Sequence, residues 1–209
     1  MNNAAPPRAP ANAKRQDILE TALRLFQTNG YQAVGINCVI EESGVAKMTM
    51  YKYFASKDAL IEAVLQERDT RFRQALEQFV ARFPDPPQRL RAVFLWHHRW
   101  FCEPTFHGCM FINAAVEFPD PGHPARQVAL THKTWLKTYV GALLAALLTT
   151  KVAERLALQC ARLLDGATVA AQLSGDPAAA FLAWNAVVSL LRQEGVAIEP
   201  GEAFDDVAG

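Results

Sequence analysis

Apolar residues recur at helical spacing through most of this chain. Between Lys14 and Thr28 they return at intervals of three and four positions, which is typical of a helix with one buried face. Asn29 and Gly30 then predict the end of that helix. No segment alternates apolar and polar residues strongly enough to indicate a strand. The pattern predicts an all-α fold whose first helix buries Ile18, Leu19, Ala22, Leu25 and Phe26.

Residues 34–58 contain two short amphipathic segments that meet at Ser43-Gly44-Val45. Gly44 follows an apolar run that ends at Ile40, in the place where a helix closing in the left-handed conformation favours glycine. A second helix starts almost at once. This arrangement predicts a helix-turn-helix, and the rest of the chain is organised around it.

The second helix of this motif has two distinct faces when it is placed on 3.6 residues per turn. One face is expected to pack and the other to stay free. No Asp or Glu occurs between Gly44 and Ser56, so the free face is locally cationic, as a helix lying against phosphates requires. The free face carries Lys47, Met48, Tyr51 and Lys52, and the packing face carries Ala46, Thr49, Met50, Tyr53 and Phe54.

A long helix is predicted next, because Ser56 is suited to cap its first turn and apolar residues keep helical spacing up to a proline-rich break at 83–87. The Pro, Ala and Asn content of the N-terminus suggests a disordered arm. Further helices are predicted at 88–101, 111–118, 124–150, 154–173 and 176–192. The expected organisation is an arm at 1–13, a compact head at 14–56, a larger helical domain at 57–195 and a frayed tail at 196–209.

Composition narrows the class of protein only slightly. The formal net charge over 209 residues is zero, which argues against coating nucleic acid or membranes by bulk electrostatics but allows a local basic patch. The four cysteines are scattered without a C-x-x-C pair, so a reducing cytoplasm is expected. The N-terminus lacks the apolar stretch of a signal peptide. The longest apolar run, 140–148, is too short to span a bilayer.

The residues of the head resemble the TetR family of transcriptional regulators. The resemblance runs over residues 22–65 and is carried by ALRLFQTNGY and GVAKMTMYKYFASKDAL. In the second domain, GCMFINAAVEFPDPGHPAR and LLDGATVAAQLSGDPAAA resemble C-terminal segments of family members more loosely. Together the two regions cover most of the chain that is expected to be ordered.

This resemblance implies an all-α homodimer with two functional parts. The head at 14–56 is then a DNA-binding domain for a palindromic operator, and the domain at 57–195 binds a small-molecule effector and forms the dimer. The implied function is a ligand-responsive regulator, most simply a repressor released by a small apolar or amphipathic effector. The resemblance implies neither a cofactor nor a metal, and no membrane partner.

The family pattern also assigns roles to individual residues of the head. It places Lys47, Met48 and Tyr51 towards base edges, with Asn37 reaching in from the preceding helix. Phosphate contacts suit lysine, tyrosine and hydroxyl side chains, whereas base contacts need groups that project into the major groove. The residues implied to contact or lie near phosphates are Thr49, Lys52, Tyr53 and Lys57.

Three positions of the motif depart from the family pattern. Gly35 stands where Ser or Thr is frequent, so a capping hydroxyl is lost. Asn37 stands where Arg is frequent, and asparagine more naturally pairs with adenine than with guanine. Met48 replaces a frequent Gly and adds a side chain that can touch a thymine methyl. These positions are where an individual operator preference is expected.

Aromatic residues crowd the middle of the second domain and suggest an effector cavity, since such cavities are mostly apolar with a few polar anchors. Aromatic residues at helical spacing also commonly form an ordinary core, and that alternative stays open. Asn113 and Glu117 are the candidate polar anchors, four residues apart on one helical face. The candidate aromatic lining consists of Trp96, Trp100, Phe101, Phe111 and Trp135.

Small residues at spacings of three and four mark the last two predicted helices and permit close helix approach. An intramolecular bundle explains them, but such a broad apolar surface on a monomer favours a four-helix dimer interface. The candidate interface residues are Ala157, Ala161, Leu164, Ala167, Ala171, Ala179, Ala183, Ala186 and Val187.

Two other functions compete with a DNA-binding regulator. The segment 97–109 holds His97, His98, Cys102, His107 and Cys109, which invites a metal or thiol sensor or an enzyme, but only His98 and Cys102 have a ligand-pair spacing. No H-E-x-x-H, phosphate-binding loop or G-x-S-x-G motif is present. A dimeric interaction protein without DNA binding is the remaining alternative.

Overall fold

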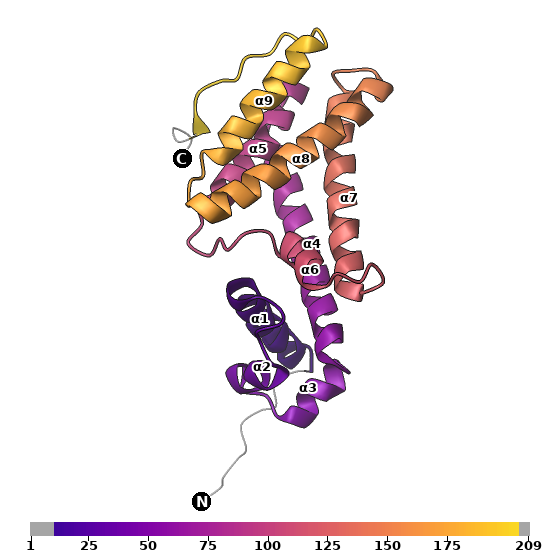
Figure 1. The fold of residues 1–209 in the computed structure, drawn as a ribbon, viewed down its shortest axis with the longest axis vertical. Helices are drawn as coiled ribbons and strands as arrows, with labels where there is room; N and C mark the ends of the chain where they lie inside the picture. Colours follow the sequence, from indigo (N-terminus) through magenta and orange to yellow (C-terminus); the bar gives the residue numbers. More distant parts are fainter. Residues whose placement is uncertain (1–10, 205–209) are drawn as a thin grey trace, which may run out of the picture.

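The computed structural model describes residues 11–204, and within this range every regular element is an α-helix. The chain forms a head of three helices and a larger helical body, joined by one long helix (Figure 1). This confirms the predicted all-α fold. None of the helices in the described range combines the length and hydrophobicity needed to cross a membrane.

The head consists of α1 (Ala11–Asn29), α2 (Ile36–Ser43) and α3 (Lys47–Tyr53). Helix α1 begins at Ala11, so the last three residues of the expected arm, 11–13, are helical, and residues 1–10 lie outside the described range. The five apolar residues predicted for the buried face of α1 are all buried. They pack with residues of the other head helices and the start of the next helix, including Val39, Met50, Phe54, Leu60 and Ile61.

Helix α4 (Lys57–Val80) carries the chain from the head into the body (Figure 1). Its start follows from the sequence, because the Ser56 hydroxyl accepts a hydrogen bond from the backbone N–H of Ala59 at 3.1 Å. Its 24 residues span about 36 Å at 1.5 Å per residue. The lower half packs against α1 and the upper half against α5 (Pro86–Phe101) and α7 (Pro124–Ala145).

The remaining helices of the body are α6 (Met110–Glu117), α8 (Thr150–Ser174) and α9 (Ala179–Gln193). The helix predicted over 124–150 ends earlier, because the chain turns after Ala145 and Thr149 becomes the N-cap of α8. Helix α9 starts three residues later than predicted. The Asp176 carboxylate accepts the backbone N–H of Ala178 at 2.9 Å and holds a turn there instead.

Residues 196–204, where we expected a frayed tail, are held against the body. The indole Nε1–H of Trp184 donates to the backbone oxygen of Pro200 at 2.7 Å, and Arg91 donates to the backbone oxygen of Glu202 at 2.7 Å. Phe204 is buried, with the Arg91 guanidinium 5.0 Å from its ring centre. The prediction of fraying is wrong for this segment, since its anchors come from α5 and α9. Residues 205–209 lie outside the described range.

Candidate nucleic-acid interface and sensor pockets

The two short helices of the head meet in a tight turn at Gly44. This glycine has φ +64°, and its N–H donates to the backbone oxygen of Glu41. A side chain is strained in that conformation, so glycine fixes the turn. Helix α3 begins three residues later, at Lys47, with Met50 and Phe54 buried against the head. The predicted helix-turn-helix is confirmed. Of the predicted packing face, Met50 and Phe54 are buried, Thr49 and Tyr53 are half-buried, and Ala46 is exposed.

The other face of α3 is exposed. Met48 is 85% exposed and Tyr51 43%. With Lys47, Thr49 and Lys52 they surround a shallow depression of about 680 Å³. The surface therefore combines two cations with two large side chains, as a helix that enters the major groove needs.

The other predicted DNA-contact residues lie around this surface. Asn37 is exposed on α2, and Tyr53 is half-buried at the end of α3. Lys57, at the first position of α4, places its Nζ 3.4 Å from the backbone oxygen of Gln32. Neither Gly35 nor Ala46 supplies a side-chain cap to the helix it precedes. The uncapped start of α3 is a feature that the sequence reading missed, although an alanine at an N-cap position signals it.

Glu117 connects the body to the head. Its carboxylate accepts the backbone N–H of Tyr31 at 2.9 Å and that of Gln32 at 2.7 Å. Tyr31 is buried, and its hydroxyl donates to the backbone oxygen of Met110 at 2.8 Å. Both ends of α6 thus hold the segment that follows α1. We expected Glu117 to anchor an effector, whereas the structure shows it bound to the head.

An apolar pocket of about 480 Å³ lies between α6, α7 and α8. Lys133 and Asp165 form an ion pair at 2.5 Å on its wall. Arg126 donates to the backbone oxygen of Pro119 at 2.5 Å and has no ion pair within the described range. Two cations and one carboxylate therefore line a largely apolar space. Its apolar lining consists of Phe111, Ile112, Ala115, Val116, Ala129 and Leu130.

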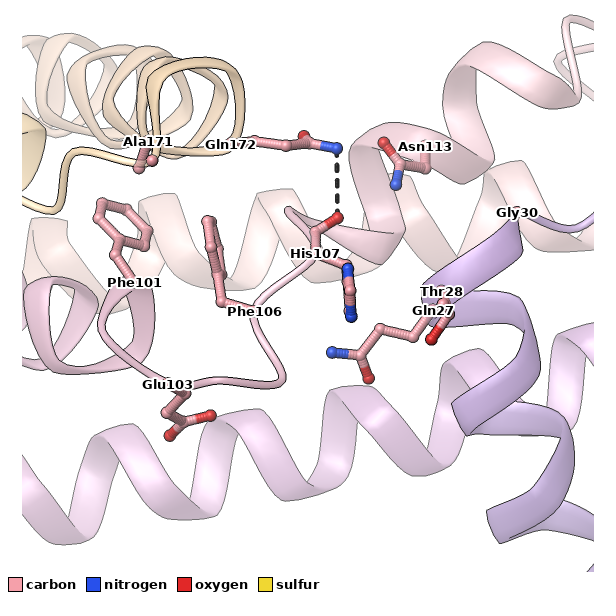
Figure 2. Close-up of a pocket in the computed structure, with 11 residues that line it drawn as sticks. Gln27, Thr28, Gly30, Phe101, Glu103, Phe106, His107, Asn113, Ala171 and Gln172 are labelled. Atoms are coloured by element: carbon pink, nitrogen blue, oxygen red, sulfur yellow. Dashed lines mark hydrogen bonds between the residues drawn. The ribbon is translucent and has the colours of Figure 1, made fainter.

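A second pocket, of about 470 Å³, lies between the head and the body, and we name it the junction pocket (Figure 2). The end of α1 contributes Gln27 and Thr28 to it, the residue after α1 contributes Gly30, and α6 contributes Asn113. The other lining residues come from the end of α5 and the loop after it and from the end of α8. They are Phe101, Glu103, Phe106, His107, Ala171, Gln172 and Gly175.

The aromatic residues predicted to line one effector cavity are divided in the structure. Phe101 and Asn113 line the junction pocket, and Phe111 lines the apolar pocket. The three tryptophans instead surround Phe72 of α4, at ring-centre distances of 4.7 Å for Trp96, 5.8 Å for Trp100 and 6.5 Å for Trp135. They form an aromatic cluster in which Trp100 is buried and Trp96 and Trp135 are half-buried against the core, which is the alternative that the sequence left open.

Two histidines of the body, His97 and His132, are buried beside this cluster. Burial lowers the pKa of His97 and of His132 to about 4, although a hydrogen bond to Val93 and one to Asp69, respectively, act in the opposite direction. Both imidazoles are neutral at pH 7. The Nδ1–H of His132 donates to the Asp69 carboxylate at 2.8 Å. Burial alone would raise the pKa of Asp69, but the hydrogen bonds from His132 and Arg73 outweigh it and lower that pKa.

The segment 97–109 does not assemble a metal site. The Sγ of Cys102 lies 3.7 Å from Nε2 of His98, whose Nδ1 contacts the backbone oxygen of Pro177 at 3.0 Å. Across residues 11–204, no three His, Cys, Asp or Glu side chains gather as metal ligands.

Cys109 is buried, and Lys133 lies beside it. Burial by itself would lower the pKa of Lys133, but the attraction of Cys109 and Asp165 outweighs that cost and raises the pKa.

The small residues that we predicted at a dimer interface mostly face the interior of the body, where α8 packs against α7 as well as α9. Ala157, Leu164, Ala167, Ala171, Ala183 and Val187 are buried within the chain itself, and Ala161, Ala179 and Ala186 are half-buried. The six buried residues cannot offer much surface to a partner. The large apolar side chains that the two helices expose are Leu158, Val169, Leu173 and Leu182.

The fold and the head together define a class of protein. A helix-turn-helix with an exposed cationic second helix, joined by one long helix to a body with internal pockets, is the architecture of a helical transcriptional regulator. Residues 18–64 match the family described as "Bacterial regulatory proteins, tetR family", and residues 86–187 match the "Tetracyclin repressor-like, C-terminal domain". The chain belongs to the TetR family of DNA-binding transcriptional regulators.

Solved structures agree over nearly the whole chain. A TetR-family transcriptional regulator from Streptomyces coelicolor is 32% identical, with a TM-score of 0.80, covering 87% of this chain and 96% of that one. A TetR transcriptional regulator from Streptomyces avermitilis, described as putative, is 26% identical with a TM-score of 0.74, covering 88% of this chain and 99% of that one.

Curated relatives match over a shorter stretch. The transcriptional activator FasR from Mycolicibacterium smegmatis is 34% identical over 86 residues, covering 41% of this chain and 39% of FasR. The transcriptional regulator LmrA from Bacillus subtilis is 34% identical over 79 residues, covering 37% of this chain and 42% of LmrA. The chain spans about two fifths of the length of these two relatives.

Proposed function

We propose that this protein is a ligand-responsive repressor that binds a palindromic operator as a homodimer and is released by a small amphipathic effector. The observation that carries the proposal is the pair of Met48 and Tyr51, held exposed between Lys47 and Lys52 on α3. Met48 packs little within the chain, and almost half of the Tyr51 side chain is exposed. In a helix-turn-helix they stand where base edges are read.

The exposed side chains of the head have two roles in the proposed complex: some contact bases and others contact phosphates. Tyr51 and Met48 contact bases, together with Asn37, which is exposed on α2. Lys52 and Lys57 neutralise phosphates, and such contacts fix the register without reading sequence. A protein with this interface acts on chromosomal DNA, so we place it in the cytoplasm.

The dimer would form through the exposed sides of α8 and α9. Leu158 and Leu163 of α8 and Ala186 and Leu190 of α9 line one shallow groove of about 780 Å³ between the two helices. Leu173 and Leu182, at 83% and 65% exposure, extend the apolar surface beyond it. A two-fold axis through this face gives a four-helix interface and sets two copies of α3 about 34 Å apart, one turn of DNA.

The effector would occupy the apolar pocket. Phe111, Val116 and Leu130 suit an apolar body, and the guanidinium of Arg126 has donors left for an acidic group. The pocket wall on α6 lies one residue from Glu117, which holds the head. An effector that displaces α6 therefore moves the head directly, and a coupling of about 1 to 3 kcal/mol is usual for such control.

The test of DNA recognition uses two substitutions on one helix. An operator is selected from a random duplex library, and binding is titrated by gel shift at several salt concentrations. Lys52→Ala should weaken binding to all duplexes and lower the salt slope by about 1. Tyr51→Ala should weaken binding to the selected operator by about fivefold, with little effect on random duplex. Unchanged binding by both variants would show that α3 is not the DNA-contact face.

A further inference from the structure

The geometry points to a second ligand site in the junction pocket, which would bind a small hydrophilic amine of about monosaccharide size. This site is separate from the apolar pocket, and its lining is mainly polar. Amide, hydroxyl, imidazole and carboxylate groups predominate in it. A ligand there would touch the head and the body at once.

Hydrogen bonds from both α1 and α8 hold the loop that forms one wall of the junction pocket. Gln27 of α1 donates from Nε2 to the backbone oxygen of Thr105 at 2.6 Å, across the boundary between head and body. Gln172 of α8 donates to the backbone oxygen of His107 at 3.2 Å (Figure 2). Gly108 has φ +85°, and a Cβ there would collide with the Gln172 amide. The loop is thus seated closely on α8, and the space beside it is a formed cavity.

The hydrogen-bonding groups of this lining are incompletely used within the chain. The Asn113 amide is half-buried and makes no side-chain hydrogen bond within residues 11–204. Gln27 and Gln172 donate through nitrogen, so their amide oxygens still have acceptor capacity. Figure 2 shows the His107 ring and the Gln27 amide extending towards each other. A ligand rich in hydroxyl groups would satisfy these donors and acceptors.

The charge of the lining selects the kind of ligand. Glu103 is the single formally charged side chain among the lining residues, and its electrostatic partner within the chain is the half-buried Arg68 of α4, which does not line the pocket. Phe101 and Phe106 stand next to each other at its edge, with ring centres 5.0 Å apart. A carboxylate beside aromatic rings attracts a cation and disfavours an anion. Rings of this kind also pack against the C–H faces of a sugar, so an amino sugar fits both features.

A ligand in this site would be linked to the position of the head. It binds fully only when α1 lies against α6 and the end of α8 as it does here, so it stabilises that arrangement. DNA affinity and ligand affinity must then change each other by the same factor. The apolar pocket and the junction pocket would give the protein two inputs of different chemistry.

The experiment is a calorimetric titration of the full-length protein, without DNA, with glucosamine, glucose and glucuronate. We expect saturable glucosamine binding with a Kd on the order of 1 mM, as suits a ligand this small. Glucose should bind about tenfold more weakly, because it lacks the charge-assisted hydrogen bond, and glucuronate should not bind. The absence of DNA separates this test from that of the proposed function.

Three variants test whether glucosamine binds in the junction pocket. Glu103→Gln should weaken glucosamine binding about tenfold and remove its advantage over glucose. Asn113→Leu, at a half-buried position, should weaken both sugars. Glu154→Gln, which removes one exposed carboxylate from the opposite end of α8, is the matched control and should bind as the unmodified chain does. Thermal unfolding of each variant verifies that it is folded.

Hydrogen exchange with bound glucosamine tests whether the ligand bridges the two parts. Protection is expected both at 25–31 in the head and at 103–113 in the body. Absence of saturable glucosamine binding at about ten times the expected Kd would overturn the proposal. So would tighter binding of glucuronate, insensitivity to Glu103→Gln, or protection on one side of the junction alone.

Discussion

The connection between Glu117 and the head gives the sharpest prediction. The carboxylate accepts two backbone N–H groups, those of Tyr31 and Gln32, at 2.9 and 2.7 Å. Glu117→Gln keeps the size of the side chain but removes its charge and replaces one acceptor oxygen with an NH₂ donor. Both N–H groups donate to the same oxygen, Oε2, and the Tyr31 N–H also lies 3.1 Å from Oε1. In the variant the two N–H groups must therefore share one neutral oxygen, while the Tyr31 N–H also faces the NH₂ group.

The expected size follows from these contacts. A hydrogen bond to a charged group contributes about 1.5 to 3 kcal/mol when buried. Glu117 is half-buried, so water replaces part of the loss, and we expect about 1.4 kcal/mol, a factor of ten. The amide protons of Tyr31 and Gln32 should therefore exchange with solvent about tenfold faster in the variant.

The assay is native-state hydrogen exchange followed by NMR. Residues in the middle of α4, which do not touch Glu117, serve as the internal reference. Glu154→Gln removes one exposed carboxylate at a distance and controls for the change in net charge. Equal exchange rates at Tyr31 and Gln32 in the Glu117→Gln variant and the unmodified chain would refute the idea that this carboxylate holds the head.

Three further predictions concern other parts of the chain. Leu182→Glu, at a 65% exposed position of α9, should shift the protein from dimer to monomer in sedimentation velocity, whereas Leu130→Glu, 60% exposed on α7, should not; an unaffected dimer would exclude this face. Ala46→Ser should supply the missing N-cap of α3 and raise the free energy of unfolding by about 1 kcal/mol in urea titrations, and no gain would contradict the capping argument. The pKa of about 4 for His97 and His132 lies below the unfolded value of 6.5, so the unfolded chain binds more protons and stability falls as pH drops from 6.5 towards 4. At pH 5 the loss relative to pH 7.5 should be about 2 kcal/mol for each imidazole, and equal stability at these two pH values would disprove their burial in the neutral form.

The head could be predicted closely because its signals are local. The turn at Gly44 depends on the φ of one residue, and the start of α4 depends on Ser56 and the residue three positions later. The exposed face of α3 follows from helical periodicity over a few residues, so Met48 and Tyr51 were separated correctly from Met50 and Phe54. Their contact with DNA stays a prediction.

The site in the body depended on contacts that no local pattern contains. Glu117 and Asn113 are four residues apart on one helix, yet one binds the head and the other lines a pocket. The partner of Glu117 lies 86 positions earlier in the chain. Likewise, spacing showed that the alanines of α8 and α9 favour close packing but not whether the neighbouring helix belongs to the same chain.

The sequence by itself thus determined the helical fold, the helix-turn-helix and the family to which its motifs belong. Periodicity, caps and turn residues act over a few positions, and a reader of the chain sees all of them. Only the tertiary structure decided that the tryptophans form a core, that Arg91 and Trp184 hold residues 196–204, and that two pockets of opposite polarity flank α6. The physical reason is that each of these features joins side chains from helices distant in sequence, whose relative placement is fixed only when the whole core packs.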